Sequence, residues 1–196
     1  MAAAFATLSH IPLKRDTPYE RPPELPPLVH LDSPAFEVMT DLRVVHAVTV
    51  SPQVSIDEAL EKMKLRGVRL LLVTDDNDAL VGLITAKDIQ GEKPVKIAQA
   101  SRIPHSAITV EAVMTPQASI EVLNMLSVRN AQVGHIVATL KALARQHALV
   151  VEVDQKSKKQ RVRGIFSTSQ ISKQLGVDAA EAVSRDATLA EIGDDV

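Results

Sequence analysis

The stretch Gly82-Leu83-Ile84-Thr85-Ala86-Lys87-Asp88-Ile89 decides the fold of this chain, because a variant of it occurs again 82 residues later as Gly164-Ile165-Phe166-Ser167-Thr168-Ser169-Gln170-Ile171. In each copy, glycine and two apolar residues belong to an apolar run that predicts a buried strand. The hydroxyl residue that follows is typical of a helix start. The repetition indicates two copies of one α/β unit.

The segments around the first copy predict the order β-α-β-β-α. The expected elements are a strand at 44–50, a helix from the Ser55-Ile56-Asp57-Glu58 capping box to Gly67, strands at 68–74 and 80–84 joined by an acidic turn, and a short helix at 85–90. The same order is predicted around the second copy. There the elements are a strand at 119–126, a helix over 133–143, strands at 147–153 and 162–166, and a helix from Ser167 to about Gly176.

The spacing of matching segments supports the repeat. Val38-Met39-Thr40 recurs as Val113-Met114-Thr115, and Val54 aligns with Val133 at the start of the central helix. We therefore expect an α/β fold of two β-α-β-β-α repeats packed with pseudo-twofold symmetry, because one unit of this size leaves its sheet poorly covered. The expected division is a Pro-rich N-terminal arm (1–35), repeat 1 (36–105), repeat 2 (106–176) and an acidic C-terminal tail (177–196).

The duplicated strand–helix junction is the candidate site. A helix start presents free N–H groups that suit a phosphate, and a hydroxyl adds a further donor. Asp88 lies on the same helix face as Thr85, and its carboxylate can accept bonds from the two hydroxyls of a ribose. Thr-x-x-Asp and Ser-x-x-Gln are also capping signals, so each pattern alone favours capping. The duplication favours a ligand site.

These residues resemble a tandem pair of CBS domains, also called a Bateman module. The resemblance is carried by Val38-Met39-Thr40, the helix at 56–63, the segments 67–75 and 80–89, and their counterparts Val113-Met114-Thr115-Pro116, 147–154 and 162–171. It covers about 34–176 and implies two clefts between the repeats that bind AMP, ADP, ATP or S-adenosylmethionine, with no cofactor required. It also implies a homodimer.

The resemblance assigns a phosphate contact to Thr85 and a ribose contact to Asp88. In the second copy Ser167 fits, but Gln170 departs from the usual Asp, and a neutral amide is a weaker ribose clamp than a carboxylate. We therefore expect the better nucleotide cleft at Thr85 and Asp88. The predicted ligand-binding residues are Thr85, Asp88, Ile84, Lys87, Arg69, Ser167, Gln170 and Phe166.

Composition limits the other possibilities. The chain has 196 residues, no cysteine, 2% aromatic residues and a net charge of −2. The absence of cysteine excludes disulfides and thiolate chemistry and fits a cytoplasmic protein. The scarcity of aromatic rings and the charge make nucleic acid an unexpected partner, and no apolar run is long enough to span a membrane.

Three other features have two interpretations each. The basic hairpin of Lys156, Lys158, Lys159, Arg161 and Arg163 is a phosphate or RNA contact or, as we favour, a solvated turn. Asp75, Asp76 and Asp78 resemble a calcium loop only loosely, and the histidines lack metal-ligand spacing; His135 and His147 are interpreted as structural. Seven prolines before residue 35 indicate either a docking segment or a flexible leader.

The sequence favours a regulatory nucleotide-binding module that acts on a separate, unknown partner. The alternative is a ligand-free oligomerisation or scaffold module that uses the Pro-rich arm. No Ser/His/Asp order, metal cluster or carboxylate pair indicates catalysis, so we expect no enzyme activity.

Overall fold

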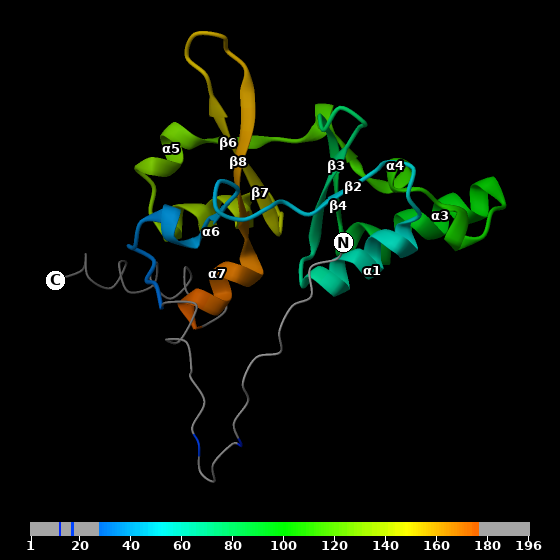
Figure 1. Cartoon of the computed structure of the whole chain (residues 1–196), viewed down its shortest axis with the longest axis horizontal. Helices are drawn as coiled ribbons and strands as arrows, with labels where there is room; N and C mark the ends of the chain where they lie inside the picture. The colour runs from blue at the N-terminus through cyan, green and yellow to red at the C-terminus, as the bar shows by residue number, and fades with distance from the viewer. Residues whose placement is uncertain (1–11, 13–16, 18–27, 177–196) are drawn as a thin grey trace, which may run out of the picture.

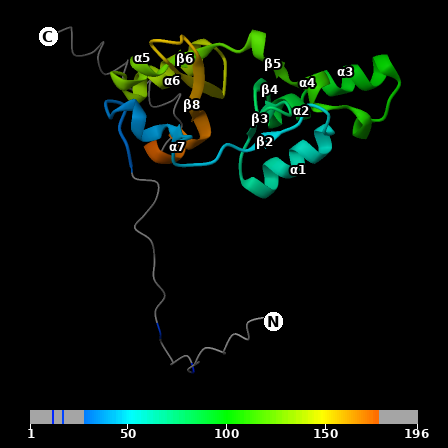
Figure 2. The same ribbon diagram turned by 45° about the horizontal axis from the view of Figure 1, so that its top comes forward.

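Two four-stranded sheets, each with its own helices, form the structure, a computed structural model that describes residues 12, 17 and 28–176. The two units lie side by side in both views (Figures 1 and 2). One sheet has the order β2-β3-β4-β5 and the other β1-β8-β7-β6. This confirms the α/β fold of two repeats.

The first unit follows the predicted order. Its elements are β2 (Thr49–Val50), α1 (Ile56–Arg66), β3 (Leu70–Thr74), β4 (Leu80–Thr85), α2 (Ala86–Gln90), α3 (Glu92–Ser101), η2 (His105–Ala107), α4 (Val110–Val113) and β5 (Thr115–Pro116). Ser55 caps α1 by accepting a bond from the Glu58 N–H, and Gly67 ends it with a left-handed φ of 64°. Ile56, Ala59 and Met63 form the buried face of α1, as their spacing predicts.

The second unit repeats this arrangement with one added helix. Its elements are η3 (Gln117–Ser119), β6 (Val122–Asn124), α5 (Met125–Arg129), α6 (Val133–Ala142), β7 (His147–Val153), β8 (Gln160–Ser167) and α7 (Thr168–Leu175). In both units the first strand is parallel to the second, and the second and third form an antiparallel hairpin. The matching topology explains the repeat in the sequence.

The edge strands cross between the units. β5 comes from the start of the second repeat (106–176) but pairs with β4 of the first unit, so that Leu83 faces Thr115. β1 (Thr40–Asp41), which follows η1 (Ala35–Val38) at the start of the first repeat, pairs with β8 of the second unit, so that Thr40 faces Ile165. Each sheet is therefore completed by a strand from the start of the other repeat.

The cores follow the same crossing. The first core contains Ile108, Val110 and Val113 together with the buried faces of α1 and β3. The second contains Val29, Ala35, Val38 and Met39 together with α6, β7 and Phe166. A third cluster around Leu70, Leu72 and Leu149 lies between the two sheets and joins the units.

Two predicted strands are too long. Of 44–50, only Thr49–Val50 is a strand, and Val44 is 80% exposed because no neighbouring strand pairs with it. Of 119–126, only Val122–Asn124 is a strand, since Asn124 caps α5 through the Leu126 N–H and turns the chain into a helix. The helices α3 and α5 were not predicted.

The predicted terminal segments lie largely outside the described residues. The tail at 177–196 and most of the arm at 1–35 belong to this part of the chain. The described end of the arm packs on the second unit: Val29 is buried, and its N–H donates to the carbonyl of Gln174 at 2.9 Å. No helix within 28–176 combines the length and the apolar character needed to cross a bilayer.

Candidate functional site

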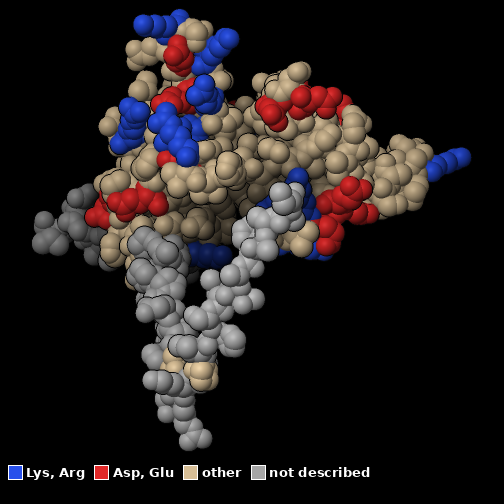
Figure 3. Space-filling view, in the orientation of Figure 1, with Lys and Arg blue, Asp and Glu red and all other residues tan. Residues whose placement is uncertain are grey.

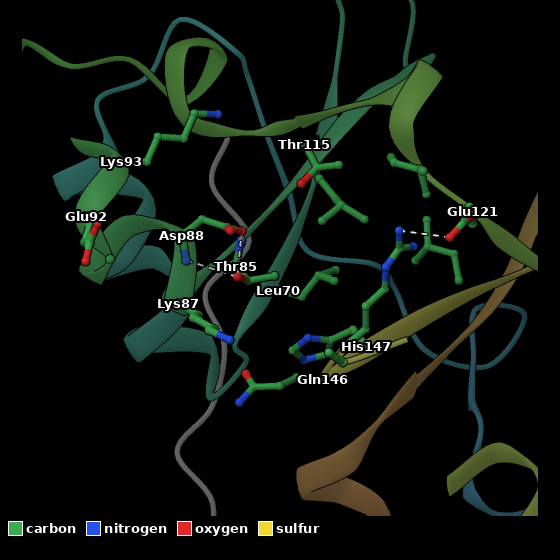
Figure 4. Close-up of a pocket in the computed structure, with 16 residues that line it drawn as sticks. Leu70, Thr85, Lys87, Asp88, Glu92, Lys93, Thr115, Glu121, Gln146 and His147 are labelled. Atoms are coloured by element: carbon green, nitrogen blue, oxygen red, sulfur yellow. Dashed lines mark hydrogen bonds and ion pairs between the residues drawn. The ribbon is translucent and has the colours of Figure 1, made fainter. Parts of the chain in front are cut away.

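A cavity of about 420 Å³ opens between the two units, and both contribute to its lining. The first unit supplies Thr85, Lys87 and Asp88, whereas the second supplies the segment 144–147 and Leu149 (Figure 4). Leu70, Leu83, Ile120 and Leu149 give it an apolar surface. The cavity is thus half apolar and half polar, as small-molecule sites commonly are.

The Thr85–Asp88 pair forms a complete capping box at the start of α2. Oδ2 of Asp88 accepts bonds from the Thr85 N–H at 2.8 Å and the Thr85 hydroxyl at 2.6 Å, and the Asp88 N–H donates to Thr85 Oγ1 at 3.2 Å. Oδ1 of Asp88 has no hydrogen-bond partner within 28–176. Capping and ligand binding are therefore compatible, because capping uses only one carboxylate oxygen.

The Thr85 hydroxyl is less available than the sequence suggests. Its hydrogen is donated to Asp88 and its oxygen accepts from the Asp88 N–H. The Ala86 N–H at the helix start also has a partner, the carbonyl of Arg69 at 3.0 Å. A phosphate contact by Thr85 would require the hydroxyl to change partner.

The opposite wall of the cavity comes from the segment before β7. Arg145 pairs with Glu121 at 3.1 Å, while Gln146 and His147 face the Thr85–Asp88 side (Figure 4). Burial lowers the pKa of His147, the nearby Arg69 lowers it further, and Asp88 opposes the shift. The imidazole is therefore neutral at pH 7.

Arg69 and Lys87 meet at a second cavity of about 310 Å³ that adjoins the first. The two cavities share Lys87, Gly91 and Gln146 in their linings. Within the described residues, the side chains of Arg69 and Lys87 form neither a hydrogen bond nor an ion pair. Two cations without a counter-ion in the described part of the chain thus lie at the adjoining cavity, and one of them, Lys87, also lines the main cavity.

The second copy of the motif does not line this cavity. Ser167 makes no side-chain cap, and its hydroxyl lies 2.9 Å from that of Ser169. Gln170 donates to Gln174 at 3.4 Å. Ile84 and Phe166, predicted as ligand contacts, have fully buried side chains in the two cores, so these side chains do not reach the cavity.

Sequence reasoning missed the wall at Glu121 and 145–149, as well as Lys93. Lys93 lines the cavity and its ammonium donates to the carbonyl of Val113 at 2.7 Å. No local motif marks these residues, because tertiary packing brings them to the cavity. The one available signal is His147, a polar residue followed by four apolar residues of its strand.

The alternative sites have structural explanations. Oδ1 of Asp75 accepts bonds from the N–H groups of Asn77 and Ala79 at 2.9 Å, so this carboxylate closes the turn rather than an ion loop. Arg163 does not belong to the exposed basic hairpin, because it is buried and paired with Asp41. The remaining cations of the hairpin cluster at its exposed tip (Figure 3).

The family comparison follows this geometry. The family model of the CBS domain matches residues 27–92, which include the Thr85–Asp88 junction. This part of the chain is similar to a CBS domain. The second repeat lies outside that match but has the same strand order and pairing. No curated protein sequence matches the chain significantly.

Solved structures, among them structures of proteins with CBS domains, are similar to this chain in fold. An uncharacterised conserved protein from Pyrococcus horikoshii is 23% identical with a TM-score of 0.52, covering 74% of this chain and 93% of its own. CBSX2 of Arabidopsis thaliana, solved in complex with AMP, is 22% identical with a TM-score of 0.48, covering 72% and 94%. The CBS-domain pair of MJ0100, solved with 5-methylthioadenosine and S-adenosyl-L-methionine, is 21% identical with a TM-score of 0.48, covering 76% and 98%.

Proposed function

We propose that the cavity between the two units binds an adenosine nucleotide and that the chain is a regulatory module. The observation that carries the proposal is the position of Asp88. Its Oδ2 is held by Thr85, while Oδ1 is left without a partner in the described part of the chain, at the wall of a cavity of about 420 Å³. A carboxylate oriented in this way accepts a ribose hydroxyl without a cost for ordering the side chain.

The other lining residues suit the rest of a nucleotide. Leu70, Leu83 and Leu149 offer aliphatic surface against which a flat base packs, and none of the described residues that line the cavity is aromatic. Arg69 and Lys87 supply positive charge for phosphate at the adjoining cavity. The choice of adenosine rests on the resemblance to CBS-domain pairs.

The second motif has a different place in the proposal. The Gln170 side chain donates to Gln174, and the Gln174 side chain donates to the carbonyl of Glu37 at 3.2 Å. Through Gln174, Gln170 therefore supports the packing of η1. We propose one nucleotide per chain, bound at Thr85 and Asp88. Action on a separate partner, a homodimer and a cytoplasmic location also belong to the proposal and rest on the resemblance alone.

A thermal-shift titration with AMP, ADP, ATP and S-adenosylmethionine tests the binding. A ligand at about 100 times its Kd adds about 2.7 kcal/mol to the free energy of unfolding. We expect a clear rise in Tm with at least one of the four. No rise with any of them at millimolar concentration would overturn the proposal in favour of the scaffold alternative.

The variant Asp88→Asn sharpens this test. Asparagine retains an oxygen for the Thr85 cap but replaces the free acceptor with an amide, so we expect the Kd to rise about 10- to 100-fold, the range for a lost bond to a charged group. The matched control is Gln170→Ala, which should leave the Kd unchanged. The opposite order would mean that the nucleotide binds at the second motif.

A further inference from the structure

His147 occupies the position in the second unit that Leu70 occupies in the first. Each is the first residue of the second strand, and each pairs with the hydroxyl residue of the motif, His147 with Ser167 and Leu70 with Thr85. Both line the cavity between the units. At two equivalent positions of the cleft, the first unit thus has an apolar leucine and the second unit has a half-buried, titratable histidine.

The charges around His147 come from several elements. Those that line its cavity or act on it are Arg69 before β3, Lys87 and Asp88 on α2, Glu92 and Lys93 on α3, Glu121 before β6 and Arg145 before β7. Most have partners within 28–176: Arg145 pairs with Glu121, Glu92 with Lys96, Lys93 with backbone carbonyls, and Asp88 with Thr85. Arg69 and Lys87 have none there.

The ligand-free site is therefore unfavourable for a protonated imidazole. Burial lowers the pKa of His147, Arg69 lowers it further, and Asp88 compensates only in part. A phosphate beside Arg69 and Lys87 reverses this balance, because its negative charge offsets the guanidinium and favours the imidazolium. His147 then donates a charge-assisted hydrogen bond, which is stronger than a neutral one.

We propose that His147 contacts the phosphate of the bound nucleotide and takes up a proton as it binds, so that the cleft selects phosphate-bearing adenosine ligands in a pH-dependent way. This inference rests on the proposed nucleotide binding at Thr85 and Asp88. Because the bound state holds one more proton than the free state, affinity increases as the pH falls. If binding raises the pKa of His147 by about one unit, the affinity gains at most about tenfold, and the full gain is reached only below the pKa of the ligand-free imidazole.

Isothermal titration of the full chain with AMP, and with adenosine as the phosphate-free control, tests this between pH 6 and pH 8. The Kd of AMP should fall several-fold from the alkaline to the acidic end in the wild type, whereas that of adenosine should not fall. In His147→Gln, a neutral side chain that still forms hydrogen bonds, the steep dependence on pH should disappear. The phosphate itself titrates with a second pKa of about 6. Its contribution to the pH dependence of the Kd is the same in both proteins and cancels in the comparison.

A second measurement follows His147 directly in the wild type. In NMR spectra of the imidazole protons, assigned by the signal missing in His147→Gln, saturating AMP should raise the pKa of His147 and adenosine should not. AMP binding with the same pH profile in both proteins, or an unchanged His147 pKa, would overturn this inference and leave the proposed function intact. Failure of adenosine and of all four candidate ligands, AMP, ADP, ATP and S-adenosylmethionine, to bind at any pH would overturn both.

Discussion

Gly82 of β4 and Gly164 of β8 lie where a segment from the other repeat packs closely on each sheet. A Cβ at Gly82 would lie 2.6 Å from the sulfur of Met114 and 2.8 Å from the carbonyl oxygen of Thr115. The three atoms nearest to a Cβ at Gly164 would all belong to the side chain of Met39, the closest at 2.5 Å. A methionine side chain can adjust, whereas the paired backbone of β5 cannot move without loss of its bonds to β4.

The substitution Gly82→Ala should therefore destabilise the protein more than Gly164→Ala. Overpacking typically costs about 1–3 kcal/mol, and we expect Gly82→Ala in that range and Gly164→Ala below it. Urea denaturation of the two variants measures the difference in the free energy of unfolding. Equal losses would show that Met39 is as constrained as the β5 backbone.

At the residue scale, the sequence predicted the site contact that depends on neighbouring residues. It did not predict which side chains of the strand before it face the cavity. The Thr85–Asp88 contact follows from a helix start with a hydroxyl residue and an acid three positions later. Side chains alternate along a strand, so the side chain of Ile84 points away from the face that carries Leu83 and Thr85 and enters the core. The wall at 145–149 comes from tertiary packing, which no local pattern encodes.

Helix α1 (Ile56–Arg66) depends on the residue before it, the N-cap Ser55, for a defined start. The Ser55 hydroxyl accepts a bond from the Glu58 N–H at 3.2 Å, while the Ile56 N–H bonds to the carbonyl of Ile108, so that the cap also orients α1 against the segment after α3. We expect Ser55→Ala to lower the free energy of unfolding by about 1 kcal/mol. Thermal unfolding measures this loss. The control is Ser51→Ala, because Ser51 accepts only a 3.4 Å turn contact and its loss should be smaller.

Elements with a regular apolar pattern were predicted well from the sequence, and others were not. The strands β3, β4, β7 and β8 and the helices α1, α6 and α7 lie within about two residues of their predicted bounds because each buries one face or both. In α3 the face packed on the first core is short and includes a proline, Pro94, with Ile97 and Ala98 only partly buried, so the apolar signal of the helix is weak. Conversely, the valines at 44 and 45 suggest a strand, but a strand also needs a partner edge.

At the scale of the whole molecule, the crossed edges make the two repeats interdependent. The first sheet needs β5, and the first core needs Ile108, Val110 and Val113, all of which follow residue 105. The second sheet needs β1, and the second core needs Val29, Val38 and Met39, all of which precede residue 106. The sequence repeats and the packing units are therefore offset along the chain.

Fragments 1–105 and 106–196, cut between the sequence repeats, should therefore not fold alone. Each loses an edge strand and several fully buried side chains, and units this small lack the buried area to tolerate that loss. We expect neither fragment to show a cooperative thermal transition by circular dichroism, and an equimolar mixture to regain one, because the missing segments are then supplied in trans. The intact chain is the reference and should unfold in a single transition. A cooperative transition in 1–105 alone would show that its own residues close the first core without β5, and that the crossing joins two units that are already stable.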